Sequence, residues 1–560
     1  MADFGEILSN IGEFGLFQKL TLFALCFPNV MQSFFIASFV FIQSDPERHC
    51  NTDWILSADS NLTTDELLNL TLPREEDGTF SRCQMFVPVD WDIGAIKEYG
   101  LNETAGCQNG WVYSNTLYDA TIVTDFDLVC DKTNLMELIQ TMFMAGVLVG
   151  SLIFGPFAES FGRKRATQIP AVIMFIFTVT AALCPNVYFL LVCQFLVGIG
   201  GGGYRVNCII LSTEWIGASK RSWGACVTQL FGALGQCILA GVIYFIRDWR
   251  LAQLITAAPL AVVAIYIWFI PESARWLLSR GRTEEAKQLI VKAAFINKRT
   301  VPDSLLEKPW FYQPGQAKGL GCIKRKAVGA RWKIEIKEAV NKGGIQIIFK
   351  SSLLTRYFFV VAFGWFSLNL ATYSLYLNMG SFGFNVFLTQ FMFGAFEMLA
   401  TLLSIWLLEV FGRRISLIST LLTGGLSCMF ILAVPKGYAI AVTSLAVAAR
   451  FFLIWSGPVC AVYMQELFPT SVRQTAMALG SLAARTGSFL APMLNMLAVY
   501  HWSIPTAVFS SFTLVSGALV FLLPETRRKE LPESADEAEN KRNVTSTTTD
   551  SSPNQDSTKL

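Results

Sequence analysis

Long apolar stretches separated by short polar segments dominate the pattern of hydrophobic and polar positions along the chain. Each stretch is close to the roughly 20 residues that an α-helix needs to cross a ~30 Å hydrocarbon layer. The pattern predicts twelve spans, at about 20–42, 136–158, 167–184, 187–212, 224–246, 251–270, 357–379, 386–408, 416–434, 438–463, 475–499 and 504–523. Composition agrees with this, because the 560 residues are 53% hydrophobic and only 15% charged, with a mean hydropathy of +0.45, whereas soluble domains carry about 25% charged residues. We therefore predict an all-α membrane protein.

A polar insertion, residues 43–134, lies between the first two spans and holds seventeen acidic residues against five basic ones. It contains four cysteines and three N-x-S/T sequons, namely Cys50, Cys83, Cys107, Cys130, Asn61, Asn69 and Asn102. An even set of cysteines beside glycosylation sequons is typical of an oxidising compartment, so two disulfides are expected in one of three connectivities. The insertion is therefore predicted to be extracellular and glycosylated.

Basic residues gather in the loops that should face the other side of the membrane. Residues 271–356 hold eighteen Lys or Arg against seven Asp or Glu, and the short loops 162–165 and 412–414 read GRKR and GRR. By the positive-inside rule these loops are cytoplasmic, and twelve spans place both termini there as well. The pattern of Glu284–Phe295 predicts a helix with an apolar and a basic face at the cytoplasmic surface.

These patterns divide the chain into five parts. The expected boundaries are a cytoplasmic N-terminus 1–19, an N-terminal six-helix half 20–270 that includes the extracellular loop 43–134, a basic loop 271–356, a C-terminal six-helix half 357–523 and a disordered tail 524–560. The last residues include Thr558 and Leu560, and they suit a PDZ-type domain that captures a free carboxylate. Such a short match makes this partner one of two open alternatives, the other being a tail that binds nothing.

Three local patterns occur twice at nearly the same offset. Glu-x-Phe-Gly-Arg recurs after 250 residues, Glu followed seven later by Arg recurs after 252, and Pro-Glu-x-x-Arg recurs after 253. The first two patterns contribute eight candidate gating residues, Glu159, Arg163, Glu214, Arg221, Glu409, Arg413, Glu466 and Arg473. The repeat predicts two six-helix halves in parallel orientation, which supports alternating access. Carboxylates and guanidiniums at adjoining cytoplasmic helix ends are expected to pair when the halves close; the alternative for the basic residues is a purely topological role.

Arg485 is a full charge inside the span that begins near residue 475. At about 1.5 Å per residue it lies roughly 16 Å into the segment that starts at Gln474, near the midplane of the hydrocarbon layer. A guanidinium there costs at least several kcal/mol unless it faces water, an anion or a carboxylate. Small neighbours such as Gly480 and Gly487 allow another helix or a ligand to approach closely. The two interpretations are an anion-binding site and a structural ion pair.

Several motifs resemble a known family. The run Gly155–Arg165 looks like the loop between helices two and three of the major facilitator superfamily, with Glu159 where Asp is usual. WRLAQLI (Trp249–Ile255), PESARWLLSRGR (Pro271–Arg282) and ELFPTSVRQT (Glu466–Thr475), with the large first loop, are similar to the organic ion transporters of solute carrier family 22. TEWIG (Thr213–Gly217) and Arg485 resemble its organic anion branch, nearest the urate/nicotinate type. The resemblance covers residues 1–530.

The resemblance implies a set of substrate-binding residues. Trp365 and Tyr373 match the family's aromatic pocket, Gln236 matches a polar position in span five, and Arg450 matches a basic position in span ten; Phe231 is a weaker candidate. Aromatic packing between helices is the alternative for any single ring. Cation transporters of the family carry an acid at the Arg485 position, while carnitine transporters also carry Arg, so this residue excludes cations better than it selects anions.

The chain also departs from the family. Thr401 stands where anion carriers often have a basic residue, Gly457 and Gly232 stand where aromatics are common, and Gln194 replaces an Arg. Arg205 adds a cation in span four, where the family is usually uncharged. Arg205 either replaces the missing cation at the substrate site or pairs with a carboxylate such as Glu397.

Other classes of protein find little support in the sequence. The sequence contains no GxxxxGK[ST] motif, so an ATP-driven pump is not indicated. The glycines of 200–203 lie inside a predicted span, where they favour helix packing over phosphate binding. His49 and His501 are the only histidines, so no metal, cofactor, enzyme activity or nucleic-acid partner is predicted. We expect a secondary-active plasma-membrane transporter that exchanges small organic anions for a counter-anion within the lipid bilayer. The alternatives are a zwitterion or cation transporter of the same family, and a non-transporting receptor that uses its first loop.

Overall fold

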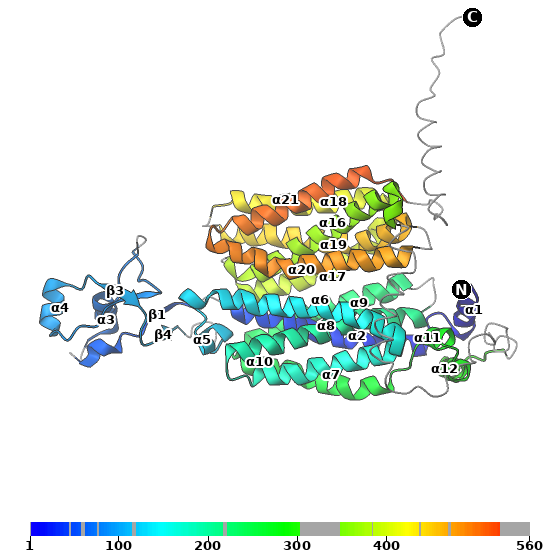
Figure 1. The fold of residues 1–560 in the computed structure, drawn as a ribbon, viewed down its shortest axis with the longest axis horizontal. Coiled ribbons are helices and arrows are strands. Elements are labelled where there is room, and N and C mark those ends of the chain that lie inside the picture. The colour runs from blue at the N-terminus through cyan, green and yellow to red at the C-terminus, as the bar shows by residue number, and fades with distance from the viewer. Residues whose placement is uncertain are drawn as a thin grey trace, which may run out of the picture.

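The computed structural model describes residues 2–43, 46–57, 62–75, 78–114, 119–216, 221–302, 348–382, 385–435, 438–468 and 472–526. Two helical bundles lie side by side, one from each half of the chain, and a small domain projects from one end of them (Figure 1). Within the described residues, eleven helices are long and apolar enough to cross a membrane. Helix α2 (Leu16–Gln43), with 28 residues, is a further helix of spanning length. The predicted twelve-helix, all-α architecture is therefore confirmed.

Each half contributes six long helices. The N-terminal half consists of α2, α6 (Asn134–Phe161), α7 (Arg163–Ala182), α8 (Val187–Trp215), α9 (Arg221–Phe245) and α10 (Trp249–Tyr266). The C-terminal half consists of α16 (Ser352–Leu377), α17 (Val386–Phe411), α18 (Arg413–Ala433), α19 (Ala439–Leu467), α20 (Arg473–Asn495) and α21 (Ile504–Leu519). Short 3-10 turns extend four of these helices, namely η4 (Ile267–Phe269), η6 (Met379–Phe382), η7 (Met496–Val499) and η8 (Val520–Leu522).

Glycines allow α6 and α8 to touch along their backbones. A Cβ atom on Gly146 would collide with the carbonyl oxygen of Phe195, and one on Gly198 would collide with that of Phe143. Gly202 meets the carbonyl oxygen of Val147 in the same way. Helices in lipid gain stability from such close contact because apolar surface alone does not drive them together. The prediction that the glycines of 200–203 serve helix packing is confirmed.

The two halves meet along two helix pairs, α9 with α17 and α6 with α20. At Gly394 of α17, a Cβ atom would lie 2.7 Å from the sulfur of Cys237 and 3.0 Å from the carbonyl oxygen of Ala233, both on α9. Helix α2 of the first half also contacts α16 and the turn η6 of the second. A polar side chain on one of these facing surfaces is therefore placed within reach of the opposite half.

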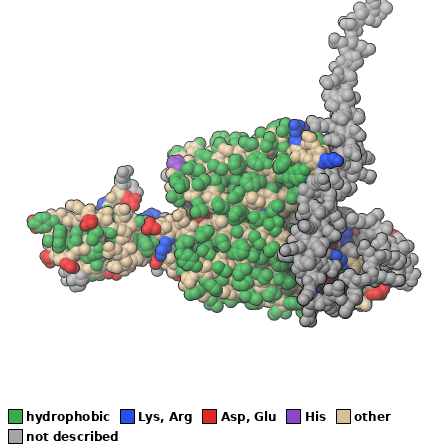
Figure 2. All heavy atoms as spheres, viewed as in Figure 1, with side chains coloured by type: hydrophobic (Ala, Val, Ile, Leu, Met, Phe, Trp, Pro, Cys, Tyr) green, Lys and Arg blue, Asp and Glu red, His purple; other side chains and the backbone are tan. Residues whose placement is uncertain are grey.

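The outside of the bundles is apolar. In Figure 2 the visible face of both bundles is covered mainly by hydrophobic side chains, and charged side chains gather at the ends and on the projecting domain. Large apolar residues such as Trp406, Phe430 and Leu152 are 62%, 58% and 50% exposed. Apolar exposure on this scale fits a surface that is solvated by lipid rather than by water.

The projecting domain corresponds to the polar insertion. It contains two short antiparallel ribbons, formed by β1 (Arg48–Cys50) with β4 (Trp111–Tyr113) and by β2 (Gln84–Phe86) with β3 (Thr104–Gly106). The helical elements are η1 (Asp53–Ser57), α3 (Thr64–Thr71), α4 (Ile93–Tyr99), α5 (Ile122–Phe126) and η2 (Cys130–Lys132). Disulfides join Cys50 to Cys107 and Cys83 to Cys130. We call this unit the disulfide domain. It has a small apolar core of its own around Cys50, Leu72 and Met85, and the disulfides supplement that core.

Two of the three sequon asparagines lie on the surface of the disulfide domain. Asn102 is exposed, and so is Asn69, whose amide donates to the carbonyl oxygen of Asp65 at 2.9 Å. Asn61 lies outside the described residues, as do Thr558 and Leu560 of the tail. Glycosylation and the PDZ-type partner therefore stay predictions.

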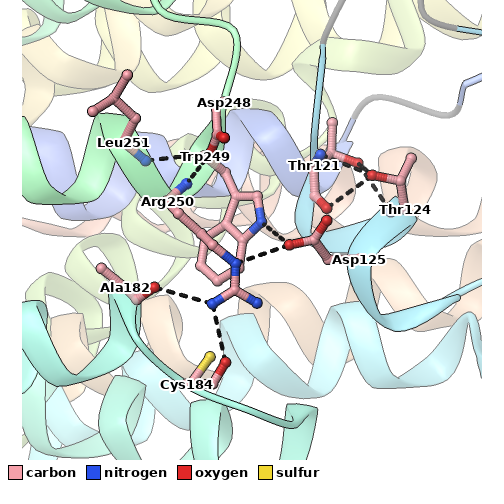
Figure 3. A network of polar contacts seen from close by, with 9 residues as sticks. All are labelled: Thr121, Thr124, Asp125, Ala182, Cys184, Asp248, Trp249, Arg250 and Leu251. Carbon is pink, nitrogen blue, oxygen red and sulfur yellow. Dashed lines mark hydrogen bonds and ion pairs between the residues drawn. The ribbon is translucent and has the colours of Figure 1, made fainter.

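An ion-pair network attaches the disulfide domain to the first half of the chain (Figure 3). Asp125 accepts hydrogen bonds from the Nε of Arg250 at 3.0 Å and from the indole of Trp249 at 2.9 Å. The Arg250 guanidinium also donates to the carbonyl oxygens of Ala182 and Cys184 at 3.1 and 3.0 Å. It stacks over the Trp249 ring at 4.7 Å. The first residues of the WRLAQLI motif thus tie α5, α7 and α10 together.

Short helices lie at the end of the bundles opposite the disulfide domain (Figure 1). These are α1 (Ala2–Ile11), α11 (Ala274–Ser279) and α12 (Thr283–Ile296), and α12 confirms the helix predicted at Glu284–Phe295. Asn297, which follows α12, donates to the carbonyl oxygen of Ile11 at 2.7 Å and to Gln18 at 2.9 Å. The segment after α10 is therefore held against the start of the chain.

Candidate functional site

Arg485 lies in the middle of α20 and is partly buried. Within the described part of the chain, its guanidinium forms neither a hydrogen bond nor an ion pair with another side chain. The helix packs closely on α16, because a Cβ atom on Gly487 would collide with the carbonyl oxygen of Phe366, and one on Gly480 would lie 2.9 Å from the ring of Trp365. The small residues that flank Arg485 therefore allow α20 to pack closely against α16, and no carboxylate of the described residues binds the charge.

Two further polar groups approach Arg485. Arg205 of α8 and Tyr373 of α16 both lie within electrostatic reach of its guanidinium. Arg205 is partly buried and donates one hydrogen bond, to the side-chain oxygen of Gln229 on α9, at 3.4 Å. Three of the predicted substrate-binding residues, Arg485, Arg205 and Tyr373, are thus brought together from three helices. Arg205 belongs to the first half of the chain, and the other two belong to the second.

A separate polar cluster crosses the interface between the halves. The Glu397 carboxylate of α17 accepts from Arg450 of α19 at 3.1 Å and from the amide of Gln236 of α9 at 2.9 Å. Arg450 also donates to the Gln236 oxygen at 3.3 Å. Its guanidinium lies over the rings of Tyr376 and Phe393, at 4.9 and 4.8 Å. We call Gln236, Glu397 and Arg450 the interhalf bridge. Its charges are desolvated, since the Arg450 and Glu397 side chains are 6% and 15% exposed.

The bridge corrects part of the sequence interpretation. Glu397 is the partner of Arg450 and not of Arg205, so the alternative that Arg205 pairs with Glu397 is wrong. Gln236 and Arg450, which were predicted to contact substrate, are bound to Glu397 in this conformation. Their contact with substrate stays a prediction, and in this conformation both side chains join the two halves through Glu397.

The aromatic candidates are divided. Tyr373 lies within electrostatic reach of Arg485. Trp365 instead packs against Gly480, where α16 contacts α20. Phe231 packs edge-on against Phe23 of α2, with ring centroids 5.6 Å apart. Tyr373 therefore lies within electrostatic reach of Arg485, and Phe231 has a packing partner of its own.

Two glycines leave open space around the helices that carry the site. A Cβ atom on Gly457 of α19 would meet no atom within 4 Å, and one on Gly232 of α9 would meet only the Ser33 hydroxyl at 3.9 Å. Gly457 lies seven residues, two helical turns, after Arg450, and Gly232 lies one turn from both Gln229 and Gln236. Each position therefore has room for a side chain that the glycine does not supply.

The repeated motifs form equivalent contacts in the two halves, at the end opposite the disulfide domain. Arg163 pairs with Glu214 at 3.3 Å, and Arg413 pairs with Glu466 at 2.8 Å. Each pair joins the start of one helix to the end of the next within the same half, α7 to α8 and α18 to α19. The pairs do not cross from one half to the other, so any gating role acts through the helix ends of each half separately.

The third repeated motif supplies helix caps. The Glu272 carboxylate accepts from the backbone N–H of Lys164 at 2.9 Å, and the Glu525 carboxylate accepts from those of Arg413 and Arg414 at 3.0 Å each. Both glutamates thereby satisfy N–H groups at the start of α7 and α18. Burial raises the pKa of the Glu272 carboxyl, and the backbone N–H groups oppose that shift. The repeated motif therefore makes equivalent hydrogen bonds in the two halves.

The remaining gating candidates differ in their surroundings. The backbone oxygen of Glu159 accepts from the Trp276 indole at 2.8 Å and from Arg280. Arg473 donates to the backbone oxygen of Phe468 at 3.3 Å. The side chains of Arg221 and Glu409 lie outside the described residues.

Sequence reasoning missed two side chains that shape the site. Gln229 holds Arg205, and Glu397, considered only as a partner for Arg205, organises the interhalf bridge. Glu397 carried a usable signal, because it is a carboxylate within a predicted span and such a group requires a buried partner. The sequence gave no indication of the role of Gln229, since a glutamine near the start of a span is not unusual.

Comparisons with known proteins are consistent with this architecture. The sugar (and other) transporter family model matches residues 89–537. Solute carrier family 22 member 13 from Homo sapiens is 34% identical over 541 residues, covering 96% of this chain and 94% of that protein. Solute carrier family 22 member 6 from Bos taurus is 30% identical over 542 residues, covering 96% and 95%. Among solved structures, the major facilitator superfamily proton:xylose symporter XylE superimposes with a TM-score of 0.57 at 17% identity, covering 93% of this chain and 99% of that one, which shows a shared fold.

Proposed function

The chain belongs to solute carrier family 22, a family of multi-pass membrane transporters and not of enzymes, and from that premise we propose that it exchanges small organic anions across the plasma membrane by alternating access. In this proposal the disulfide domain is extracellular, and α1, α11, α12 and both termini are cytoplasmic. The anion enters the space between the halves, is held there and leaves on the other side in exchange for a counter-anion. No cofactor takes part.

The observation that carries the proposal is the contrast between two arginines of the second half, the buried Arg450 and the partly buried Arg485. Arg450 has its charge neutralised by Glu397. Arg485 lies in an equally apolar part of the chain, yet no carboxylate of the described residues binds it, and Arg205 adds a second positive charge nearby. An uncompensated guanidinium inside a membrane protein is expensive. A carboxylate of the substrate supplies the missing partner, with charge-assisted hydrogen bonds of a strength that neutral groups do not reach.

The remaining lining groups suit a small anion with a flat ring. Tyr373 offers a ring and a hydroxyl within electrostatic reach of Arg485. A zwitterion such as carnitine needs a second, acidic or aromatic, group for its ammonium. The acidic candidate Glu397 is occupied by Arg450 and Gln236, which favours the organic anion over the zwitterion.

Removal of the Arg485 charge tests the function. Losing a charge-assisted hydrogen bond costs about 1.5–3 kcal/mol of binding, so Arg485→Ala should lower anion uptake at least tenfold. Uptake is measured in cells or proteoliposomes, with the amount at the surface determined by biotinylation. The control is Arg282→Ala, which removes an exposed arginine that pairs with Glu285 far from the site. Near-normal uptake by surface-expressed Arg485→Ala protein contradicts the assignment.

A competition panel identifies the substrate class and separates the transporter from a receptor. Nicotinate, urate, a dicarboxylate and carnitine compete against one labelled anion, in vesicles loaded with an opposing anion. We expect the anions to compete and carnitine to compete weakly. Absence of exchange with every member of the panel supports a non-transporting protein that acts through its disulfide domain.

A further inference from the structure

An exposed aromatic groove lies on the disulfide domain, far from the transport site. Its volume is about 430 Å³, and four residues line it, Trp91, Asp92, Ala95 and Tyr99. Trp91, Ala95 and Tyr99 follow one another at intervals of four residues, so they lie along one side of α4, with the small Ala95 between the two rings. Trp91 is 47% exposed and Tyr99 is 71% exposed. Neither ring stacks on another ring or on a cation among the residues that the structure describes.

Water surrounds this groove, and lipid does not reach it. Figure 1 places α4 at the tip of the disulfide domain, away from the two helical bundles. A pair of large rings exposed to water on a small domain is a common sign of a binding surface. With the disulfide domain outside the cell, the occupant of the groove comes from the extracellular side.

The sequon at Asn102 starts three residues after Tyr99. Its backbone is fixed on both sides, because the N–H of Gly100 closes the last turn of α4 at 3.0 Å and the carbonyl oxygen of Glu103 accepts from the N–H of Val87 at 2.9 Å. Three residues span at most about 11 Å. Asn102 is exposed, and its side chain forms no hydrogen bond with any described residue. A group attached to this amide therefore starts beside the end of the groove.

The other two sequons lack this arrangement. Ala58 stands three residues before Asn61, and Glu66 stands three residues before Asn69. Asn69 lies within α3, where its amide donates to the carbonyl oxygen of Asp65 at 2.9 Å. Among the three sequons, Asn102 alone follows an aromatic residue at this spacing.

We propose that the groove binds the N-linked glycan of Asn102, with the first N-acetylglucosamine on the ring of Tyr99 and the following sugars along α4 towards Trp91. One face of a sugar ring carries C–H bonds, which pack against the electron-rich face of an aromatic ring. In the modification, the bond from C1 of N-acetylglucosamine to a lipid diphosphate breaks, a bond from C1 to Nδ2 of the asparagine forms, and an amide proton is lost. The inference goes beyond transport and rests only on the extracellular placement of the disulfide domain.

The glycan should stabilise α4. This helix has seven residues, and isolated helices shorter than about 12–15 residues are marginal in water. A sugar that covers Tyr99 and Trp91 joins the two ends of the helix from outside. Opening of α4 then requires that the sugar leave the rings, so the backbone amides of α4 exchange with solvent more slowly.

Hydrogen exchange in α4 of the full-length, purified protein tests the proposal. The protein is made in cells that add oligomannose glycans, and the mass of the peptide that contains Asn102 gives its occupancy. One sample is trimmed with an endoglycosidase that leaves the first N-acetylglucosamine, and a second is treated with an amidase that removes the whole glycan and converts the asparagine to aspartate. Exchange in α4 should be at least about threefold faster in the second sample. Equal exchange in the two samples, or an unmodified Asn102, overturns the proposal.

Variants assign the effect to the ring. Asn102→Gln is free of glycan without the added carboxylate, and it should exchange as fast as the amidase-treated sample. Tyr99→Phe should keep the difference between trimmed and glycan-free protein, whereas Tyr99→Ala should abolish it. Asn69→Gln is the matched control and should leave exchange in α4 unchanged. A difference that persists in Tyr99→Ala contradicts stacking on this ring, and the two wild-type samples stay decisive if that variant does not fold.

One further outcome identifies a different occupant. Exchange in α4 that slows with rising protein concentration and ignores the glycan shows that a second copy of the chain covers the groove, and it overturns the proposal. Failure of anion uptake by the wild-type protein refutes the proposed function and leaves this inference standing, because exchange in α4 is measured without substrate.

Discussion

Glu397 is the residue whose neutralisation should weaken the contact between the halves most. Glu397→Gln keeps the shape and one acceptor oxygen for Gln236 but removes the negative charge 3.1 Å from Arg450. At an effective dielectric constant of about 20, two unit charges at that distance attract by about 5 kcal/mol. Desolvation offsets part of this in the native pair, yet the variant leaves Arg450 charged, 5% exposed and unpaired. Breaking a buried pair on one side in this way costs about 3–5 kcal/mol.

Thermal unfolding of the detergent-solubilised protein measures the effect. With about 2–4 °C per kcal/mol for a unit of the size of one half, the unfolding midpoint of Glu397→Gln should fall by at least about 6 °C. Glu285→Gln is the control, because its ion pair with Arg282 is about half exposed and should change the midpoint little. Arg450→Gln and the double variant complete a double-mutant cycle.

The cycle decides whether the bridge is a coupled unit. We expect the double variant to be less destabilised than the sum of the single variants by at least about 1.5 kcal/mol, because the second substitution removes the orphaned charge that the first created. Single effects that add to within about 0.5 kcal/mol would refute the reasoning, since they would mean that Glu397 and Arg450 contribute independently.

Three further predictions concern other parts of the molecule. Asp125→Asn should lower stability by about 1–2 kcal/mol, since it weakens two hydrogen bonds that attach the disulfide domain, and the exposed Asp90→Asn is the control; equal midpoints for the two would count against the anchor. Gly487→Ala should cost about 1–3 kcal/mol because its Cβ meets backbone, whereas Gly241→Ala, with open space around it, should be neutral or stabilising; the reverse order would contradict the packing of α20 on α16. Burial raises the pKa of Glu272 above its ordinary 4.5, so the folded protein holds this proton more tightly than the unfolded chain does. The stability that this proton contributes is complete below pH 4.5 and is lost as the pH rises through the raised pKa. In Glu272→Gln the unfolding temperature should therefore change less with pH over that window than in the wild-type protein. An unchanged dependence of the unfolding temperature on pH would exclude Glu272 as its source.

The sequence by itself determined the architecture of this protein. The length of each apolar stretch is a local property, and lipid satisfies no backbone group, so twelve stretches of spanning length had to become twelve helices. The repeat of Glu-x-Phe-Gly-Arg and Pro-Glu-x-x-Arg likewise fixed which helix ends are equivalent, because the same local motif makes the same cap in each half. Arg485 was recognisable as a functional candidate from its position within an apolar segment alone.

Only the tertiary structure decided which charges are paired and which are left for a ligand. Gln236, Glu397 and Arg450 lie far apart along the chain, and the packing of α9 and α19 on α17 brings them within hydrogen-bond distance. The sequence suggested Glu397 only as a partner of Arg205, because the pattern of buried charges carries no distances from which its true partner, Arg450, could be chosen. The same reason left the disulfide connectivity open among three possibilities. Once the fold assigns Glu397 to Arg450, Arg205 and Arg485 are left within electrostatic reach of each other with no carboxylate of the described residues bound to them, and the candidate site follows from that assignment.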